Sequence, residues 1–116
     1  MVKRGLLEDK SFSAAVAIIK LGKRLISKSE YDLGRQILKS GTSVGANIRE
    51  AKRAESDLDY IHKLAIAQKE CEETLYWLEL LKETGINTDE EFAHHYPFFD
   101  ELMKIISYTI IKKKRG

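Results

Sequence analysis

Apolar residues recur three and four positions apart along four successive segments of this 116-residue chain, with polar residues between them. That spacing places the apolar side chains on one face of a helix, whereas a half-buried strand would alternate apolar and polar residues. No segment alternates in this way. Short connections between amphipathic helices make neighbouring helices antiparallel. The pattern therefore predicts an all-α, antiparallel up-down four-helix bundle.

Capping residues place the ends of the first two helices. The first segment begins around Asp9 or Ser11 and ends near residue 27. Ser29, followed three positions later by Asp32, resembles a capping box and predicts a second helix over about residues 30–54. The first helix carries Phe12, Val16, Ile19 and Ile26 on one face, with Ile18, Leu21 and Leu25 widening that stripe, so we expect this helix to bury two flanks.

The third and fourth helices carry clearer signals. A serine and an aspartate three positions apart open a third helix over 56–83, and Gly85 supplies its stop. Thr88 and Glu91 form a capping box for the fourth helix. Pro97 lies inside that helix and lacks the amide that a helix interior needs, so we expect a kink or a restart there.

The stretch KSGTSVGANIREA, residues 39–51, holds two glycines four positions apart. A phosphate-binding loop would need a preceding strand and a fuller glycine fingerprint, and this stretch has neither. Gly34, Gly41 and Gly45 share one helical stripe, where they cost about 3 kcal/mol relative to alanine. The stripe therefore predicts a close helix crossing that offsets this cost.

Two amides lie on inward stripes of the second and third helices, Asn47 and Gln68. One interpretation is a buried polar contact between them that fixes the register of the bundle, as single polar residues do in coiled coils. The other is that one or both reach water at the edge of the bundle. The sequence leaves both open.

Composition fits one globular domain spanning residues 1–116, with a basic tail at about 112–116. The formal net charge of +2 is too small to indicate a nucleic-acid binder by itself. The charge is nevertheless segregated, because residues 1–30 hold seven basic and three acidic groups and residues 61–90 hold three and seven. One cysteine, no signal sequence and no membrane-spanning run suit a cytoplasmic protein without a membrane partner.

Two long motifs resemble a known family: SGTSVGANIREA at 40–51 and DYIHKLAIAQKECEETLYWLELL at 59–81. Both are similar to the bacterial four-helix-bundle proteins encoded within intervening sequences of 23S rRNA genes. The resemblance implies a compact antiparallel bundle that assembles into rings, often pentameric. It extends to the accessory variability determinant proteins of retroelements, which act as basic ring-shaped partners of a reverse transcriptase and nucleic acid. It implies no established catalytic activity.

The residue types that carry metal or acid–base chemistry do not form a site pattern. The chain has three histidines, of which His94 and His95 are adjacent. It holds one Glu-x-x-His, from Glu91 to His94, whereas a di-iron bundle needs this motif on each of two helices. We interpret the histidines as solvent-facing or at helix ends, and Cys71 as a small hydrophobic residue. We therefore expect no metal, no cofactor, no small-molecule substrate and no enzymatic activity.

Two sets of residues remain as candidates for binding. Tyr76 and Trp77 lie in an apolar stretch too broad for one core, so part of it is expected at a subunit interface. The basic candidates are Lys20, Arg24, Lys28, Arg49, Lys52, Arg53, Lys112, Lys113, Lys114 and Arg115. Repeated around a ring, these residues would gain avidity. The leading hypothesis is a homo-oligomer that binds RNA or a ribonucleoprotein weakly, and the alternative is a protein-interaction adapter without nucleic-acid binding.

Overall fold

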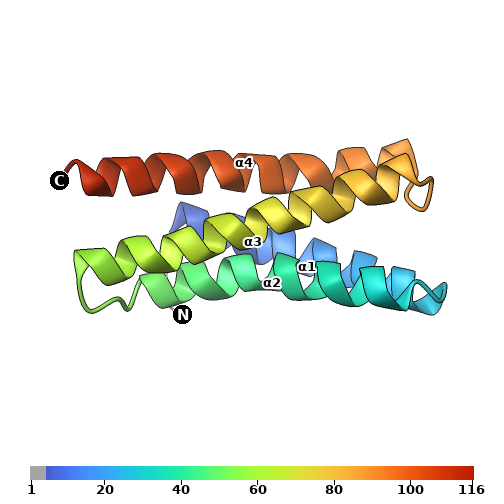
Figure 1. The fold of residues 1–116 in the computed structure, drawn as a ribbon, viewed down its shortest axis with the longest axis horizontal. Helices are drawn as coiled ribbons and strands as arrows, with labels where there is room; N and C mark the ends of the chain where they lie inside the picture. The colour runs from blue at the N-terminus through green and yellow to red at the C-terminus, as the bar shows by residue number, and fades with distance from the viewer. Residues whose placement is uncertain (1–4) are drawn as a thin grey trace.

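The computed structural model describes residues 5–116, which form four helices and no strand (Figure 1). The helices are α1 (Leu6–Ser27), α2 (Tyr31–Ala51), α3 (Asp57–Glu83) and α4 (Asp89–Lys114). The predicted all-α fold with four helices is confirmed. Each helix packs against the next and α1 also packs against α4. The backbones of the diagonal pairs, α1 with α3 and α2 with α4, do not approach closely within the described part of the chain.

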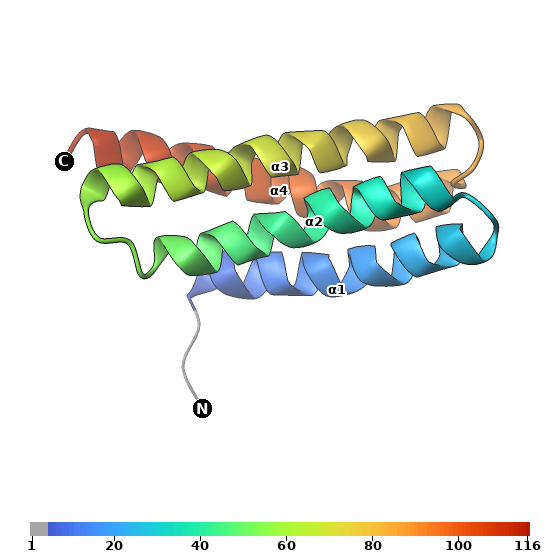
Figure 2. The same ribbon diagram turned by 60° about the horizontal axis from the view of Figure 1, so that its bottom comes forward.

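The connections between helices alternate between the two ends of the molecule (Figure 2). One end, which we call the tail end, holds the start of α1, the α2–α3 connection and the C-terminus of α4. The other, which we call the far end, holds the α1–α2 and α3–α4 connections. The basic groups near the C-termini of α2 and α4 therefore lie at the same end.

The connection between α1 and α2 does not contain the predicted helix cap. Ser29 does not cap α2, which begins after Glu30 without a side-chain cap. Ser29 instead adopts a left-handed conformation, with φ of 67°, and the amide of Glu30 donates to the carbonyl of Leu25 at 2.8 Å. This is the arrangement that ends a helix, so Ser29 belongs to the C-terminus of α1. In addition, α1 begins earlier than predicted, at Leu6, and α2 ends earlier, at Ala51.

The later helix ends follow the capping residues. The amide of Asp59 donates to the Ser56 hydroxyl at 3.0 Å, and the capping box of Thr88 and Glu91 is present. Of the kink or restart expected at Pro97, the restart is wrong, because α4 continues through this residue. Both Pro97 and Ala93, whose carbonyl loses its donor to the proline ring, are exposed, so water can replace the missing amide.

The inward face of α1 contains only part of the predicted stripe. Phe12, Val16 and Ile19 are 48%, 40% and 37% exposed. The face that packs into the bundle is instead made of Ser11, Ala14, Ile18, Leu21, Gly22 and Leu25. Several of these residues are small, which lets α2 approach closely. The large apolar residues of the predicted face therefore remain on the surface of the protomer.

The glycine stripe of α2 faces α1. A Cβ atom added to Gly41 would lie 2.7 Å from Cγ2 of Ile18, and one added to Gly34 would lie 2.8 Å from Cγ1 of Ile26. Real Cβ atoms do not approach so closely, so both glycines are required by the short distance between the helices. Gly45 is less tightly enclosed, since its nearest neighbour would be the Ser11 hydroxyl at 3.4 Å.

The two amides do not meet. Asn47 donates to the carbonyl of Ser43 in its own helix at 2.8 Å, and Gln68 donates to the Ser107 hydroxyl of α4 at 2.9 Å. The buried polar contact between α2 and α3 joins the hydroxyls of Ser40 and Thr74, 2.8 Å apart. Both residues are fully buried, and their small side chains permit this contact where the helices approach.

Candidate nucleic-acid interface

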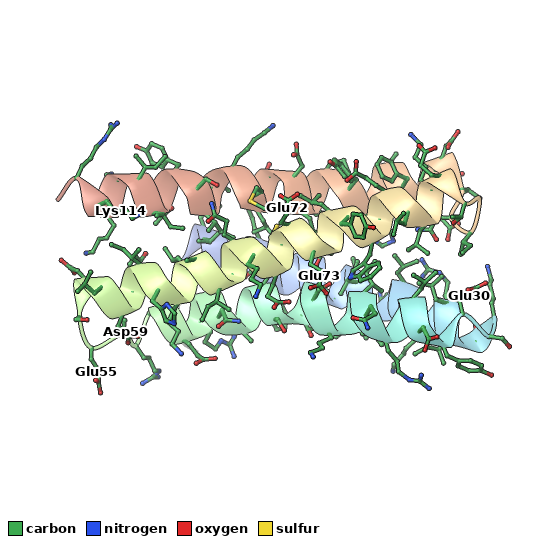
Figure 3. All side chains as sticks on the ribbon, in the orientation of Figure 1. Glu30, Glu55, Asp59, Glu72, Glu73 and Lys114 are labelled. Atoms are coloured by element: carbon green, nitrogen blue, oxygen red, sulfur yellow. The ribbon has the colours of Figure 1, made fainter. Side chains whose placement is uncertain are left out.

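Seven of the predicted basic residues gather at the tail end of the bundle. Arg49, Lys52 and Arg53 lie at the end of α2, and residues 112–115 lie at the end of α4. Figure 3 shows Lys114 at the same end as the α2–α3 connection. The structure therefore brings together two groups of basic residues that are about 60 positions apart in the sequence.

Contacts around Tyr60 connect these two groups. The ammonium group of Lys113 lies 3.2 Å from Oδ1 of Asp57 and 5.4 Å from the centre of the Tyr60 ring. Tyr60 and Thr109 line a hollow of about 220 Å³ together with Lys112 and Lys113. The same two residues also line a neighbouring hollow of about 310 Å³ with Lys52. The basic ends of α2 and α4 thus border one continuous surface.

A buried carboxylate holds two of these basic groups in place. Glu8 of α1 accepts from Nε of Arg49 at 3.2 Å and from Nζ of Lys52 at 2.9 Å. The hydrogen bond from Lys52, with support from Arg49, holds the pKa of Glu8 below its usual value despite its desolvation. Sequence reasoning missed Glu8 because it lies 41 residues from Arg49. The ion pairs fix both cations in position and reduce the positive field that they present.

The remaining basic groups of the tail end have no such partner. Arg53, Lys112, Lys114 and Arg115 are exposed, and none forms an ion pair with a residue that the structure describes. Four cations on one surface, none of them in an ion pair with a described residue, are able to bind an anion from solution.

Three predicted basic residues lie elsewhere. Lys20, Arg24 and Lys28 occupy the second half of α1 and the turn that follows it, at the far end. Nη2 of Arg24 lies 3.9 Å from Oε2 of Glu91 in the first turn of α4. The ten predicted residues therefore do not form one surface, because α1 and α2 run in opposite directions.

The aromatic pair of α3 divides between two environments. Trp77 is half-buried against the core and donates from Nε1 to Oε2 of Glu73 at 3.1 Å. Tyr76 is 54% exposed. It lies on the outer face of α3 between Glu72, which Figure 3 labels, and Glu79. Trp77 therefore contributes to packing inside the protomer, whereas Tyr76 is available to a partner.

The expectation that all histidines face solvent or sit at helix ends is wrong for His95, which is 2% exposed. Burial lowers its pKa from 6.5 to about 4, so the ring is neutral at pH 7. Cys71 is also buried, and burial raises the pKa of its thiol to about 12. A thiol with this pKa is not a nucleophile near neutral pH. Residues 5–116 contain no group of three or more potential metal ligands.

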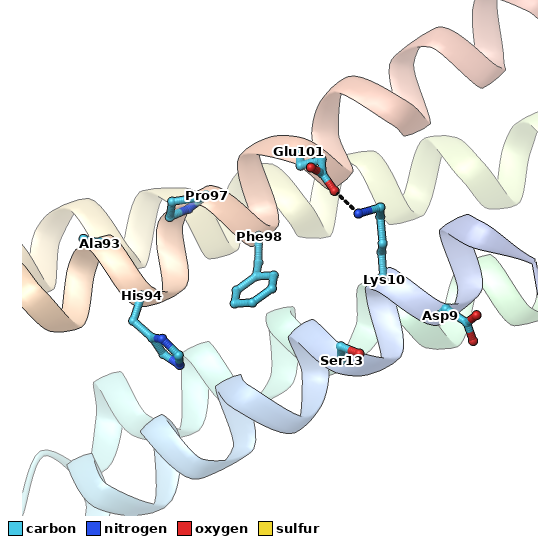
Figure 4. Close-up of a pocket in the computed structure, with 8 residues that line it drawn as sticks. All are labelled: Asp9, Lys10, Ser13, Ala93, His94, Pro97, Phe98 and Glu101. Carbon is cyan, nitrogen blue, oxygen red and sulfur yellow. Dashed lines mark ion pairs between the residues drawn. The ribbon is translucent and has the colours of Figure 1, made fainter.

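A groove of about 540 Å³ runs between α1 and α4 (Figure 4). The side chains of His94 and Phe98 point from α4 toward α1. Lys10 and Glu101 form an ion pair across the groove, so these two charged groups satisfy each other. The remaining wall from α4 is largely apolar, with Ala93, Pro97 and Phe98. The groove therefore combines an apolar stretch of α4 with polar residues contributed by both helices.

Comparison with known proteins shows the family. A model of the 23S rRNA-intervening sequence protein family matches residues 7–108, which include parts of all four helices. The chain belongs to this family. The region that matches the 23S rRNA-intervening sequence proteins covers most of the bundle, and the four basic residues 112–115 at the end of α4 lie beyond it. The predicted resemblance is confirmed.

A solved structure supports the same assignment. The chain is 44% identical to a protein of unknown function from the S23 ribosomal protein family of Bacteroides thetaiotaomicron, with a TM-score of 0.88. The match covers 90% of this chain and 98% of that one. A search of curated proteins found no match. None of the helices in residues 5–116 has the length and apolar character needed to span a bilayer.

Proposed function

We propose that this member of the 23S rRNA-intervening sequence family is a non-enzymatic, antiparallel up-down bundle that self-associates and binds RNA or a ribonucleoprotein through its tail end. The observation that carries this proposal is the cluster of Arg53, Lys112, Lys114 and Arg115, four exposed cations without an ion-pair partner among the described residues. Arg49 and Lys52 lie beside this cluster on the same end.

Helix stability alone does not account for so many cations. A basic residue in the last turn stabilises a helix by about 0.3–1 kcal/mol through the helix dipole, and this effect is confined to that turn. One or two basic groups would meet this need in α4, yet four follow one another at 112–115. Phosphate groups are the common ligands of such a cluster in nucleic acids.

The expected binding is electrostatic and nearly independent of sequence. Lysine and arginine contacts to phosphates supply affinity without reading bases. Tyr60 lies beneath Lys113, so we expect no exposed stacking platform at this position. One protomer would bind weakly, and self-association into a ring, often pentameric in similar proteins, would multiply the contacts and strengthen binding by avidity.

Fluorescence anisotropy with a labelled structured RNA tests the proposal. The variant carries glutamine at Lys112, Lys113, Lys114 and Arg115, and we expect it to lose most of the affinity of the natural chain at low salt. A matched control replaces four other exposed basic residues by glutamine: Arg35, Lys39, Lys69 and Lys104. It should keep most of the affinity. Equal losses in the two variants would refute a localised binding surface.

The α1–α4 groove favours a second candidate function, that of an adapter that captures a protein partner without nucleic acid. Phe98 is 43% exposed on the wall of this groove. An adapter would keep partner binding in the tail variant and lose it on Phe98→Asp. If the chain binds RNA through its tail end, the tail variant should lose RNA affinity and Phe98→Asp should keep it. The same two variants therefore separate the two functions.

A further inference from the structure

Two helix faces on opposite sides of the bundle carry opposite charge. Residues 20–28, which form the last part of α1 and its C-cap, hold four basic residues and no acidic one. The second half of α3, from residue 70 to residue 83, holds five acidic residues and one basic residue. The charges that are segregated along the sequence therefore lie on two different helices, the basic ones on α1 and the acidic ones on α3.

Each charged face also exposes apolar side chains. On α1, the exposed residues Val16, Ile19, Lys20 and Lys23 follow one another at helical spacing, and we call them the basic α1 face. On α3, the exposed residues Glu72, Tyr76, Glu79 and Glu83 do the same, and we call them the acidic α3 face. An apolar centre with charged neighbours is typical of a protein–protein interface.

The charges of both faces are unpaired within the protomer. Lys20 and Lys23 form no ion pair with any residue in 5–116, and neither do Glu72 and Glu79. By contrast, Glu50 and Asp57 on other surfaces each have a lysine partner, at 3.1 Å and 3.2 Å. The two faces thus retain charge that a partner can neutralise.

The bundle places the two faces in complementary positions. Because α1 and α3 are diagonal, their outer surfaces point away from each other. Both helices run from the tail end to the far end, so their second halves lie at similar heights along the bundle (Figure 2). A second copy placed beside the first with the same orientation would bring its basic α1 face against the acidic α3 face.

We propose that the partner of the acidic α3 face is the basic α1 face of a second copy of this chain, in a head-to-tail interface. A two-fold interface would place like charges opposite each other, α1 against α1 or α3 against α3, and like charges disfavour such contacts. Head-to-tail contacts form a ring when the rotation between copies closes. This inference rests on the self-association in the proposed function and assigns the surfaces that make it.

The arrangement has a consequence for the tail end. Copies related by rotation about an axis along the bundle keep their tail ends on the same side of the ring. The basic clusters of all subunits would then lie on one rim, where a single RNA can contact several of them. Charge complementarity between α1 and α3 and avidity at the tail end therefore act on separate surfaces.

Charge reversal tests the interface, with oligomer mass measured by light scattering and folding checked by circular dichroism. Lys20→Glu with Lys23→Glu should reduce the mass to that of one chain, and Glu72→Lys with Glu79→Lys should do the same. The chain carrying all four changes should recover the mass of the natural oligomer, because its two faces are again complementary. Lys39→Glu with Lys104→Glu makes the same change of net charge as the α1 reversal, on the outer surfaces of α2 and α4, and should leave the mass unchanged.

Two results would overturn the interface: reversed variants that keep the full mass, or a fourfold variant that stays monomeric while folded. If the fourfold variant does not fold, an equimolar mixture of the two reversed chains decides the question, since they should associate with each other but not with themselves. A natural chain that is monomeric would overturn both the interface and the proposed self-association. RNA binding by the tail end is measured separately and would stand or fall on its own titration.

Discussion

Replacing Gly41 by alanine would place a methyl group in the closest part of the α1–α2 crossing. The new Cβ would lie 2.7 Å and 2.9 Å from the two γ carbons of Ile18, and 3.2 Å from its Cβ. Rotation about χ1 cannot relieve the last contact, because the Cβ atom of Ile18 is fixed to the backbone of α1. The two helices must therefore move apart.

The expected magnitude follows from two opposing terms. Forcing a methyl group into a well-packed core costs about 1–3 kcal/mol. Alanine in place of glycine in a helix interior returns about 1 kcal/mol. The net destabilisation by Gly41→Ala should be about 1 kcal/mol. Gly45→Ala is the matched control, because its Cβ would meet nothing closer than 3.4 Å. The control should stabilise the fold by up to about 1 kcal/mol.

Urea unfolding of both variants at one protein concentration measures the difference, since self-association makes stability depend on concentration. The helix-propensity term is common to both substitutions and cancels, so Gly41→Ala should be less stable than Gly45→Ala by about 1–3 kcal/mol. Equal free energies of unfolding for the two variants would refute the close crossing at Gly41.

Three further predictions concern buried polar groups. Burial lowers the pKa of His95 from 6.5 to about 4, so between these pH values the unfolded chain binds more protons than the folded one. The free energy of unfolding, measured with urea, should therefore fall by about 2 kcal/mol from pH 7 to pH 5. The variant His95→Leu should abolish this fall. Thr74→Val leaves the Ser40 hydroxyl buried without its partner. It should destabilise the fold by about 1–3 kcal/mol, whereas adding Ser40→Ala should restore most of the loss. Glu8→Gln removes the charge that holds two basic groups of the tail end, so RNA affinity measured by anisotropy should rise while thermal stability at pH 7 falls.

Much of the fold could be predicted because helical periodicity and capping residues are local signals. The boxes at Ser56 and at Thr88 depend only on residues within one turn, and both caps are present in the structure. Ser29 has the same local pattern, but the end of α1 uses it in a left-handed conformation. A local motif at a short connection can serve either of the two helices that it joins, and the sequence does not say which.

The inward face of α1 could be predicted only in part, because this helix has two apolar stripes. Val16 and Ile19 are as hydrophobic as Ile18 and Leu21, so periodicity does not distinguish a face buried in the protomer from one left outside. Small residues decide the matter here, since Ala14 and the glycines of α2 allow the closest approach. The partners of the two amides were also out of reach, because they depend on the axial positions of the helices.

The candidate surface at the tail end follows from topology more than from any motif. The basic groups of α2 and α4 come together because both helices end on the same side of an alternating bundle, and this could have been read from the predicted helix order. The role of Glu8 could not be predicted from the sequence, because its contact with Lys52 spans 44 residues and depends on how α1 lies relative to α2. The same topology separates Lys20, Arg24 and Lys28 from the tail.

The salt dependence of RNA affinity in the natural chain tests the central claim most directly. Affinity for a labelled duplex RNA is measured by anisotropy across a series of salt concentrations. If the tail end binds phosphates, log affinity should fall linearly with log salt, by about 0.9 for each phosphate contacted. Replacing residues 112–115 by glutamine should lower that slope by about 3 to 4 for each protomer engaged. Affinity that does not change with salt, or a slope that is the same in the tail variant, would contradict the account.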